Sequence, residues 1–115
     1  MLEKGGIYLA SLYPSKGAEP GKVRPVLIMQ SNTLNEIEHS TVVILPITSK
    51  LIDDTFPLRF RLQPRDKLNQ ESDVLCDQIR VIDMKRITSE KLAMLSIEEI
   101  VQVEQQIKMV LDMMD

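Results

Sequence analysis

Short segments of β-type sequence, separated by turn residues, make up most of this chain, and a long helical pattern is confined to its end. Residues 5–12, 24–31, 41–50, 56–62 and 72–83 are rich in branched and apolar side chains. Five such segments without alternating helices favour a small barrel or twisted sheet over repeated β-α-β units. We expect one domain over residues 1–115, because this length is enough to bury one hydrophobic core.

The segment 56–62 has the clearest strand pattern. Leu58, Phe60 and Leu62 alternate with Arg59 and Arg61, which predicts one apolar face and one cationic face. The segment 72–83 is the longest strand candidate, with a bend near its middle. The residues between the strands, 13–22 and 32–40, are predicted to be a long loop and a polar turn.

Two prolines set expectations for the strands that contain them. Proline has no N–H to donate to a β-ladder, so Pro25 is expected at the first position of its strand. For the same reason, Pro46 is expected to interrupt the ladder of the strand 41–50 before Thr48, Ser49 and Lys50. A core strand would then end in three polar groups.

The helical signals come last. Residues 88–95 predict a short helix capped by Thr88 or Ser89, and Ser96 with Glu99 forms a capping box at which a C-terminal helix begins. The apolar residues of that helix recur at spacings of three and four and form one stripe. We expect this stripe to pack on the chain's own sheet, because the opposite face is acidic rather than basic. The stripe contains Ile100, Val103, Ile107, Val110, Leu111 and Met114.

The net charge of −3 argues against a protein that coats nucleic acid through bulk electrostatics. The charge is uneven, however. Residues 1–95 carry 13 Lys and Arg against 12 Asp and Glu, whereas residues 96–115 carry one against five. The body can therefore hold a local basic surface, and the alternative is scattered solubilising charge. The candidates are Lys16, Lys22, Arg24, Lys50, Arg59, Arg61 and Arg80.

The inventory of reactive side chains excludes several kinds of site. The only histidine, His39, lies in a polar turn, and the only cysteine, Cys76, is expected to be a small apolar filler. The sequence has no glycine-rich phosphate loop and no G-x-S-x-G elbow. No apolar run reaches the roughly 20 residues of a membrane span, so a cytoplasmic protein is expected.

Three motifs resemble one protein family. "KGAEPGKVRPVLIMQ", "VVILPITSK" and "LCDQIRVID" occur in this order in a chain of this length, and together they are similar to the MazF/PemK toxins of type II toxin–antitoxin systems. The resemblance implies a mainly β, SH3-like small barrel with a C-terminal amphipathic helix packed on the sheet. It also implies a homodimer that needs no metal or other cofactor. The implied activity is sequence-selective cleavage of single-stranded RNA to 2′,3′-cyclic phosphate and 5′-hydroxyl ends, neutralised by an antitoxin with a disordered acidic C-terminal segment.

The motifs also imply site residues. The arginine of "VRP" is Arg24 and the threonine of "PITSK" is Thr48, which match the family's catalytic pair, and Glu19 matches an acidic loop position linked to activity. The serine common before that position is Ala18 here, which leaves the base preference open. For Thr48 the alternative is a strand residue with a satisfied hydroxyl. The candidate RNA-binding residues are Lys16, Ser49, Lys50, Phe56, Asp77 and Gln78.

Two of these RNA-binding candidates have a structural alternative. Phe56 is expected either to stack on a base or to belong to the core. Gln78 is expected either to contact RNA or to be a strand-edge amide bonded to backbone.

The proposed residue types suit phosphodiester chemistry. A guanidinium offers two parallel donors to phosphate oxygens, and Pro25 would hold the backbone of Arg24 in place. Thr48 would donate a hydrogen bond to the same phosphate or to the leaving oxygen. The base that removes the 2′-proton is open, and Glu19 is a candidate if the loop 13–22 folds over the substrate.

Two other functions remain compatible with such a barrel. The first is a gyrase-targeting toxin, whose C-terminus is aromatic, unlike "VLDMMD" in this chain. The second is a non-catalytic SH3-like binding module, whose grooves are usually lined with aromatic residues. Only 3% of the residues here are aromatic, which disfavours the module.

Overall fold

The computed structural model describes residues 1–12 and 22–113. The described residues form seven strands: β1 Gly6–Ser11, β2 Val23–Ile28, β3 Thr41–Thr48, β4 Arg59–Leu62, β5 Ser72–Leu75, β6 Arg80–Asp83 and β7 Ala93–Met94. They also form two α-helices, α1 Asn32–Glu36 and α2 Ile97–Val110, and a 3₁₀ helix, η1 Met84–Arg86.

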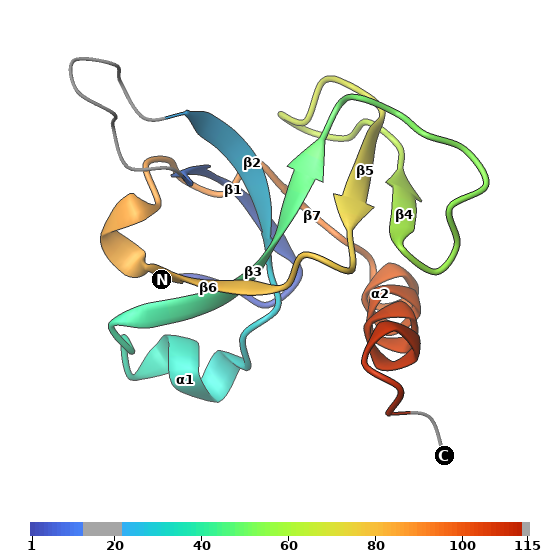
Figure 1. The fold of residues 1–115 in the computed structure, drawn as a ribbon. Coiled ribbons are helices and arrows are strands. Elements are labelled where there is room, and N and C mark those ends of the chain that lie inside the picture. The colour runs from blue at the N-terminus through green and yellow to red at the C-terminus, as the bar shows by residue number, and fades with distance from the viewer. Residues whose placement is uncertain (13–21, 114–115) are drawn as a thin grey trace.

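Strand β3 joins the two halves of the sheet. The strand order is β4-β5-β3-β2-β1-β7, and β6 also pairs with β3. Residues Thr41 to Ile44 pair with β6, while Ile47 and Thr48 pair with β5, all antiparallel. One edge of β3 thus changes partner along its length, and the sheet curls into a half-barrel with α2 packed on it (Figure 1). The predicted mainly β, SH3-like architecture is confirmed.

Both faces of the central strands are buried. Ile7 of β1, Leu27 of β2 and Leu45 of β3 contribute to one core cluster, which also contains Val103 of α2. The alternate residues contribute to a second cluster, which includes Ala10, Val26, Ile28, Val42, Ile44 and Ile82. Because side chains alternate along a strand, two cores on opposite faces hold the direction of every side chain in β1, β2 and β3.

Helix α2 begins and packs as its sequence predicts. Ser96 and Glu99 form the capping box, and Val103 is fully buried against the sheet with Ile100 and Ile107 partly buried beside it. The buried Gln106 adds a polar link, since its Nε2 donates to the carbonyl oxygens of Pro57 and Arg59, both at 2.9 Å. The stripe is not covered along its whole length: Leu111 is half exposed, and Met114 lies outside the described residues.

The expectation for Pro25 was wrong, whereas Pro46 does interrupt a ladder of its strand. Pro25 is the third residue of β2, at a point where β2 pairs with β1 and its ladder with β3 has not begun. Pro46 lies inside a continuous β3, between the residues that pair with β6 and those that pair with β5. A residue without an N–H is tolerated at both places, because one edge of the strand is unpaired there.

Three local predictions also differ from the structure. The polar turn 32–40 contains the short helix α1, capped by Ser31. The segment 88–95 is not a helix, because the N–H groups of Thr88 and Leu92 donate to the β1 carbonyls of Leu9 and Ile7. The segment 72–83 is bent as expected, but the bend separates two strands, β5 and β6. Among the described residues, no helix is long and apolar enough to cross a bilayer.

Glu99 joins the start of α2 to the loop after β4. It accepts from the Ser96 N–H and pairs with both terminal nitrogens of Arg65, one of them at 2.8 Å. The Arg65 guanidinium is the main reason that the pKa of Glu99 lies below its usual range. A carboxyl group with a lowered folded-state pKa stabilises the fold above its unfolded pKa, and this contribution disappears as the pH falls through the folded value.

Glu99→Gln should therefore lower the free energy of unfolding by about 0.5–1 kcal/mol at pH 7, because the amide retains the cap but loses the ion pair. Urea unfolding of both proteins should show this difference shrinking as the pH falls below the unfolded-state pKa of about 4.3 towards the lower folded-state value. Arg65→Gln is the matched variant and should follow the same pH course. A difference that stays constant with pH would contradict this account.

Candidate functional site

Arg24 and Thr48 face the same side of the sheet. Val26 pairs with Pro46 across β2 and β3, and Arg24 and Thr48 each lie two residues beyond this pair, on the same face of their strands as Val26 and Pro46. Both residues line a cleft of about 290 Å³, here called the catalytic cleft after the pair that the sequence predicts to be catalytic. The two core clusters fix which side chains point to which face, so the strands themselves bring this pair together.

The catalytic cleft is cationic. Its polar lining residues are Arg24, Thr48, Lys50, Arg59, Gln78 and Arg80, and no carboxylate is among its described lining residues. The guanidinium of Arg80 is tied to the sheet, because Nη2 donates to the carbonyl oxygen of Leu12 at 3.2 Å. Four cations around one hollow attract an anion, even though the whole chain has a net charge of −3.

The guanidinium of Arg24 carries an unpaired donor. Its Nε is buried and has no hydrogen-bond partner among residues 1–12 and 22–113. Leaving a buried donor unpaired is unfavourable, whereas a hydrogen bond to an anion is among the stronger kinds of hydrogen bond. Arg24 therefore keeps a donor that no described residue uses.

The hydroxyl of Thr48 keeps its proton available. Thr48 is only 9% exposed, and its Oγ1 accepts from the Lys50 N–H at 3.1 Å. No hydrogen bond within the described part of the chain uses the hydroxyl hydrogen. Since a hydroxyl can accept and donate at once, Thr48 can donate to a ligand while Lys50 holds its oxygen.

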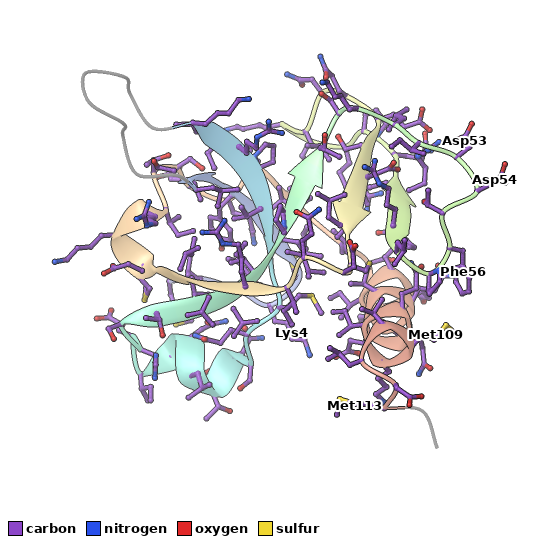
Figure 2. All side chains as sticks on the ribbon, viewed as in Figure 1. Lys4, Asp53, Asp54, Phe56, Met109 and Met113 are labelled. Carbon is purple, nitrogen blue, oxygen red and sulfur yellow. The ribbon has the colours of Figure 1, made fainter. Side chains whose placement is uncertain are left out.

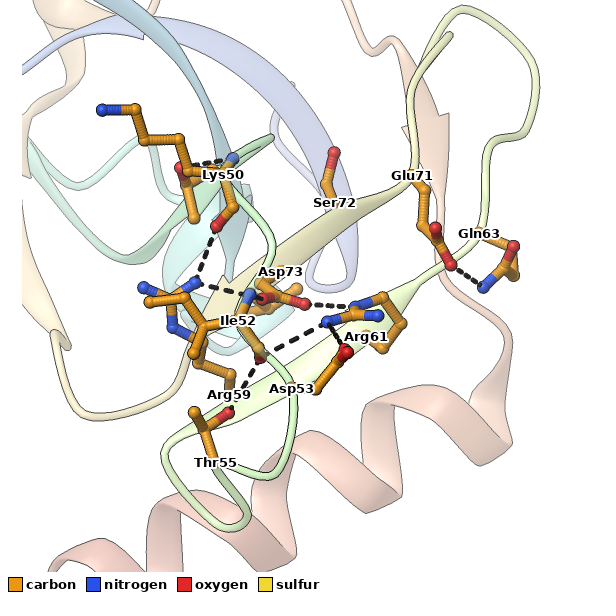
Figure 3. A network of polar contacts seen from close by, with 12 residues as sticks. Lys50, Ile52, Asp53, Thr55, Arg59, Arg61, Gln63, Glu71, Ser72 and Asp73 are labelled. Atoms are coloured by element: carbon orange, nitrogen blue, oxygen red, sulfur yellow. Dashed lines mark hydrogen bonds and ion pairs between the residues drawn. The ribbon is translucent and has the colours of Figure 1, made fainter.

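A buried carboxylate fixes the chain just after Thr48. The side chain of Asp73 is 1% exposed, and the residue lies opposite Thr48 in the ladder between β5 and β3. Its Oδ2 accepts from the Ile52 N–H at 3.1 Å and from Arg59 Nη1 at 3.0 Å, while its Oδ1 accepts from Arg61 Nε at 2.6 Å (Figure 3). Arg59 Nη1 also donates to the Lys50 carbonyl at 2.9 Å. Residues 50–52 are thereby tied to β4 and β5.

The two arginines of this network are not equivalent. Burial would raise the pKa of Asp73, but the hydrogen bonds from Arg61, the Ile52 amide and Arg59 outweigh it and hold that pKa below its usual range. Arg61 contacts two carboxylates, Asp73 and Asp53, and these hydrogen bonds raise its pKa. Arg59 contacts only Asp73 among the described carboxylates, and it is the one of the two that lines the catalytic cleft.

Four of the other predicted site residues line one of three cavities. Lys50 and Gln78 line the catalytic cleft, and Ser49 lines a neighbouring cavity that also includes Arg24. Phe56 lines a separate cavity of about 500 Å³, here called the outer hollow, together with residues 52–55, Arg59, Arg61 and Asp73. Figure 2 shows Asp53, Asp54 and Phe56 along the same outer loop. The alternative of a core role for Phe56 was wrong, since it is 68% exposed.

Asp77 and Gln78 are not inside a strand. They follow β5 in a turn where the Gln78 N–H donates to the Leu75 carbonyl, and both side chains are exposed. The predicted residues Lys16 and Glu19, and Ala18 beside them, lie outside the described residues.

The sequence-based site omitted Arg59, Arg80 and Asp73. The alternation of residues 58–62 already put Arg59 on a cationic face, and both arginines were among the candidate basic residues. The missing information was the register between β4 and β5, which places Asp73 beside Arg61 and selects which arginine borders the cleft.

Comparisons with known proteins agree with this geometry. The family model described as PemK-like, MazF-like toxin of type II toxin–antitoxin system matches residues 3–111. The chain belongs to this family.

Solved structures show the same fold in toxins of low sequence identity. Toxin MazF-mt6 of Mycobacterium tuberculosis is 22% identical with a TM-score of 0.76, covering 93% of this chain and 96% of that one. MazF in a MazE–MazF structure from Deinococcus radiodurans is 22% identical with a TM-score of 0.79, over 98% and 97% of the two chains. An endoribonuclease from a mycobacterial species, solved with its cognate antitoxin, is 19% identical with a TM-score of 0.68, over 95% and 91%. MazF/PemK toxins are endoribonucleases with antitoxin partners.

The toxin's single cysteine is unsuited to nucleophilic chemistry. Cys76 is fully buried, and its Sγ lies 3.8 Å from the Val74 carbonyl oxygen and from Gln106 Nε2. Burial, and secondarily the charge of Asp77, raises its pKa to about 12. The thiolate is the reactive form, so the thiol is inert at neutral pH.

We expect the native toxin to resist alkylation by iodoacetamide at pH 8 and to react with one equivalent after unfolding in guanidinium. Mass spectrometry of the intact protein measures both states. Complete labelling of the native protein within minutes would show that Cys76 is accessible and would overturn this assignment.

Proposed function

We propose that this toxin is a metal-independent endoribonuclease that cleaves single-stranded RNA to 2′,3′-cyclic phosphate and 5′-hydroxyl ends. The observation that carries the proposal is the convergence of the Arg24 guanidinium and the Thr48 hydroxyl, from two neighbouring strands, on one cationic cleft. Both groups have a donor that no described residue occupies. The endoribonuclease activity of the MazF/PemK family supports the same proposal.

In the proposed reaction, the 2′-oxygen of a ribose attacks the adjacent phosphorus, and the bond from phosphorus to the 5′-oxygen breaks. Negative charge builds on the non-bridging oxygens, where the Arg24 guanidinium donates. Thr48 donates to the same phosphate or to the departing 5′-oxygen. The 2′-proton passes to a base, for which Glu19 is the candidate, and the leaving oxygen gains a proton as it becomes the 5′-hydroxyl.

The remaining candidates would bind the RNA on either side of the scissile phosphate. Lys50 and Gln78 lie in the catalytic cleft, and Ser49 lies in the cavity next to it. The exposed ring of Phe56 offers a surface on which a base can stack. We assign Lys16 and Asp77 to the same RNA surface from their positions in the family motifs.

The cationic cleft also suits the proposed antitoxin. A disordered acidic segment that folds onto the toxin would place carboxylates among the four cations that line the cleft, and it would exclude RNA. We propose that the toxin acts as a homodimer, as the family resemblance implies. Light scattering of the purified toxin, alone and with the antitoxin, tests the assembly.

Arg24→Ala should slow RNA cleavage by about 10²- to 10³-fold, the usual effect of losing one oxyanion donor. The matched control is Lys85→Ala, which also removes one positive charge but lies in η1, outside the cleft. The assay is single-turnover cleavage of a long transcript in EDTA, with circular dichroism to confirm folding. Unchanged cleavage by a folded Arg24→Ala would end the assignment.

Thr48→Val keeps the shape of the side chain and removes its hydroxyl. We expect cleavage to fall by about 10- to 10²-fold, the effect of one hydrogen bond to a charged group, while Thr48→Ser retains most of the activity. If a folded Thr48→Val cleaves as fast as wild type while Thr48→Ser is impaired, the methyl group matters and not the hydroxyl, and the assignment fails.

Mapping the ends on a defined transcript distinguishes the proposal from its rivals. A nuclease of this type leaves 2′,3′-cyclic phosphate ends in the presence of EDTA and fails on a substrate with 2′-deoxyribose at the cleaved position. Intact RNA with inhibited DNA supercoiling would favour a gyrase-targeting toxin. Intact RNA and normal supercoiling would favour a binding module.

A further inference from the structure

Arg59 lies between two cavities. It lines the catalytic cleft with Arg24 and Thr48, and it also lines the outer hollow with Phe56. Its side chain is 19% exposed, so part of it remains open to solvent. Arg59 is therefore placed at the boundary that an RNA strand occupying both cavities would cross.

One edge of the Arg59 guanidinium is fixed and the other is free. Nη1 donates to Asp73 Oδ2 at 3.0 Å and to the Lys50 carbonyl at 2.9 Å. Within the described residues no hydrogen bond engages Nε or Nη2. A guanidinium held on one side and open on the other is pre-organised to bind an oxyanion, because little side-chain freedom is lost on binding.

Arg61 differs from Arg59 in its hydrogen bonds and in the cavity that it lines. Its Nε donates to Asp73 at 2.6 Å and its Nη2 donates to Asp53 at 2.9 Å, with a longer bond to the Ile52 carbonyl at 3.3 Å. Its charge thus lies between two carboxylates, and it borders the outer hollow but not the catalytic cleft. Two arginines on the same strand share one buried partner and face different surroundings.

We propose that Arg59 is a second phosphate-binding residue, which holds the RNA phosphate adjacent to the scissile one, and that the buried Asp73 positions it. This inference rests on the proposed function. When the scissile phosphate contacts Arg24 and Thr48 and a neighbouring base lies against Phe56, the backbone between them passes Arg59. Asp73 acts indirectly, by orienting the Arg59 guanidinium, whose Nη1 also donates to the Lys50 carbonyl (Figure 3).

The test compares Arg59→Gln with Arg61→Gln, since each removes one ion pair with Asp73. Binding of a fully 2′-deoxy or 2′-O-methyl oligonucleotide, which cannot be cleaved, is measured over a series of salt concentrations. Arg59→Gln should reduce the slope of log K against log salt by about 0.7, the value of one phosphate contact in a single strand. It should also slow RNA cleavage about tenfold.

Arg61→Gln should leave the salt slope unchanged and the cleavage rate within about threefold of wild type, although both variants lose an Asp73 contact. Thermal unfolding measures the loss of stability in each. Equal losses of binding and cleavage in the two variants, or an unchanged salt slope in Arg59→Gln, would overturn the proposal.

The positioning role of Asp73 needs its own comparison. Arg59→Lys keeps the positive charge but cannot bind Asp73, the Lys50 carbonyl and a phosphate in the same planar arrangement. We expect Arg59→Lys to keep the salt slope of binding but to cleave RNA about tenfold more slowly than wild type. A folded Asp73→Asn should show the same two results. Full activity in Arg59→Lys would show that charge alone is needed and would remove Asp73 from the proposal.

The outcomes separate this inference from the proposed function. If the wild-type toxin does not cleave RNA, the proposed function fails, but the salt slopes still decide whether Arg59 contacts a phosphate. If the wild type cleaves and Arg59→Gln matches it in rate and slope, only the second phosphate contact is wrong.

Discussion

The buried carboxylate of Asp73 is the interaction on which the arrangement of the site depends. An ionised group that is 1% exposed is stable only when its oxygens are fully hydrogen-bonded, and here two arginines and a backbone amide provide those bonds. The same bonds tie residues 50–52 to β4 and β5. Because Lys50 in turn holds the Thr48 hydroxyl oxygen, a single buried charge connects the edge of the sheet to the cleft.

Strand β3 explains why the cleft forms where it does. It pairs with β6 along its first half and with β5 at its end, so one edge changes partner near Pro46. Thr48 is the last residue of this strand and Arg24 is near the beginning of β2. Polar groups at those positions emerge beyond the second hydrophobic core, while the residues behind them, Val26 and Ile44, remain fully buried. The polar groups of the cleft are therefore carried on strands that the hydrophobic core holds in place.

The local charge of the surface depends on which cations are ion-paired, more than on the net charge of the chain. Arg61 contacts two carboxylates and Arg65 contacts Glu99, so these cations stabilise loops and the start of α2. Arg24, Lys50 and Arg80, together with Arg59, which is paired with Asp73, line a hollow without a described carboxylate in its lining. A chain with an acidic C-terminal helix and a net charge of −3 can thus present a local surface for an anionic chain.

The sequence by itself determined the β-rich class, the capping box of Ser96 and Glu99, the cationic face of residues 59–61 and, through the family motifs, the pair Arg24 and Thr48. These features depend on side-chain alternation, local capping and motif order, all of which are readable along the chain. It misplaced Pro25 and predicted a helix at 88–95, because strand pairing outweighs local preference. Only the tertiary structure decided that Asp73 would meet Arg59 and Arg61 and that Arg59, not Arg61, would border the cleft. Those contacts join residues that are 12 or more positions apart, and their register is set by packing rather than by local sequence.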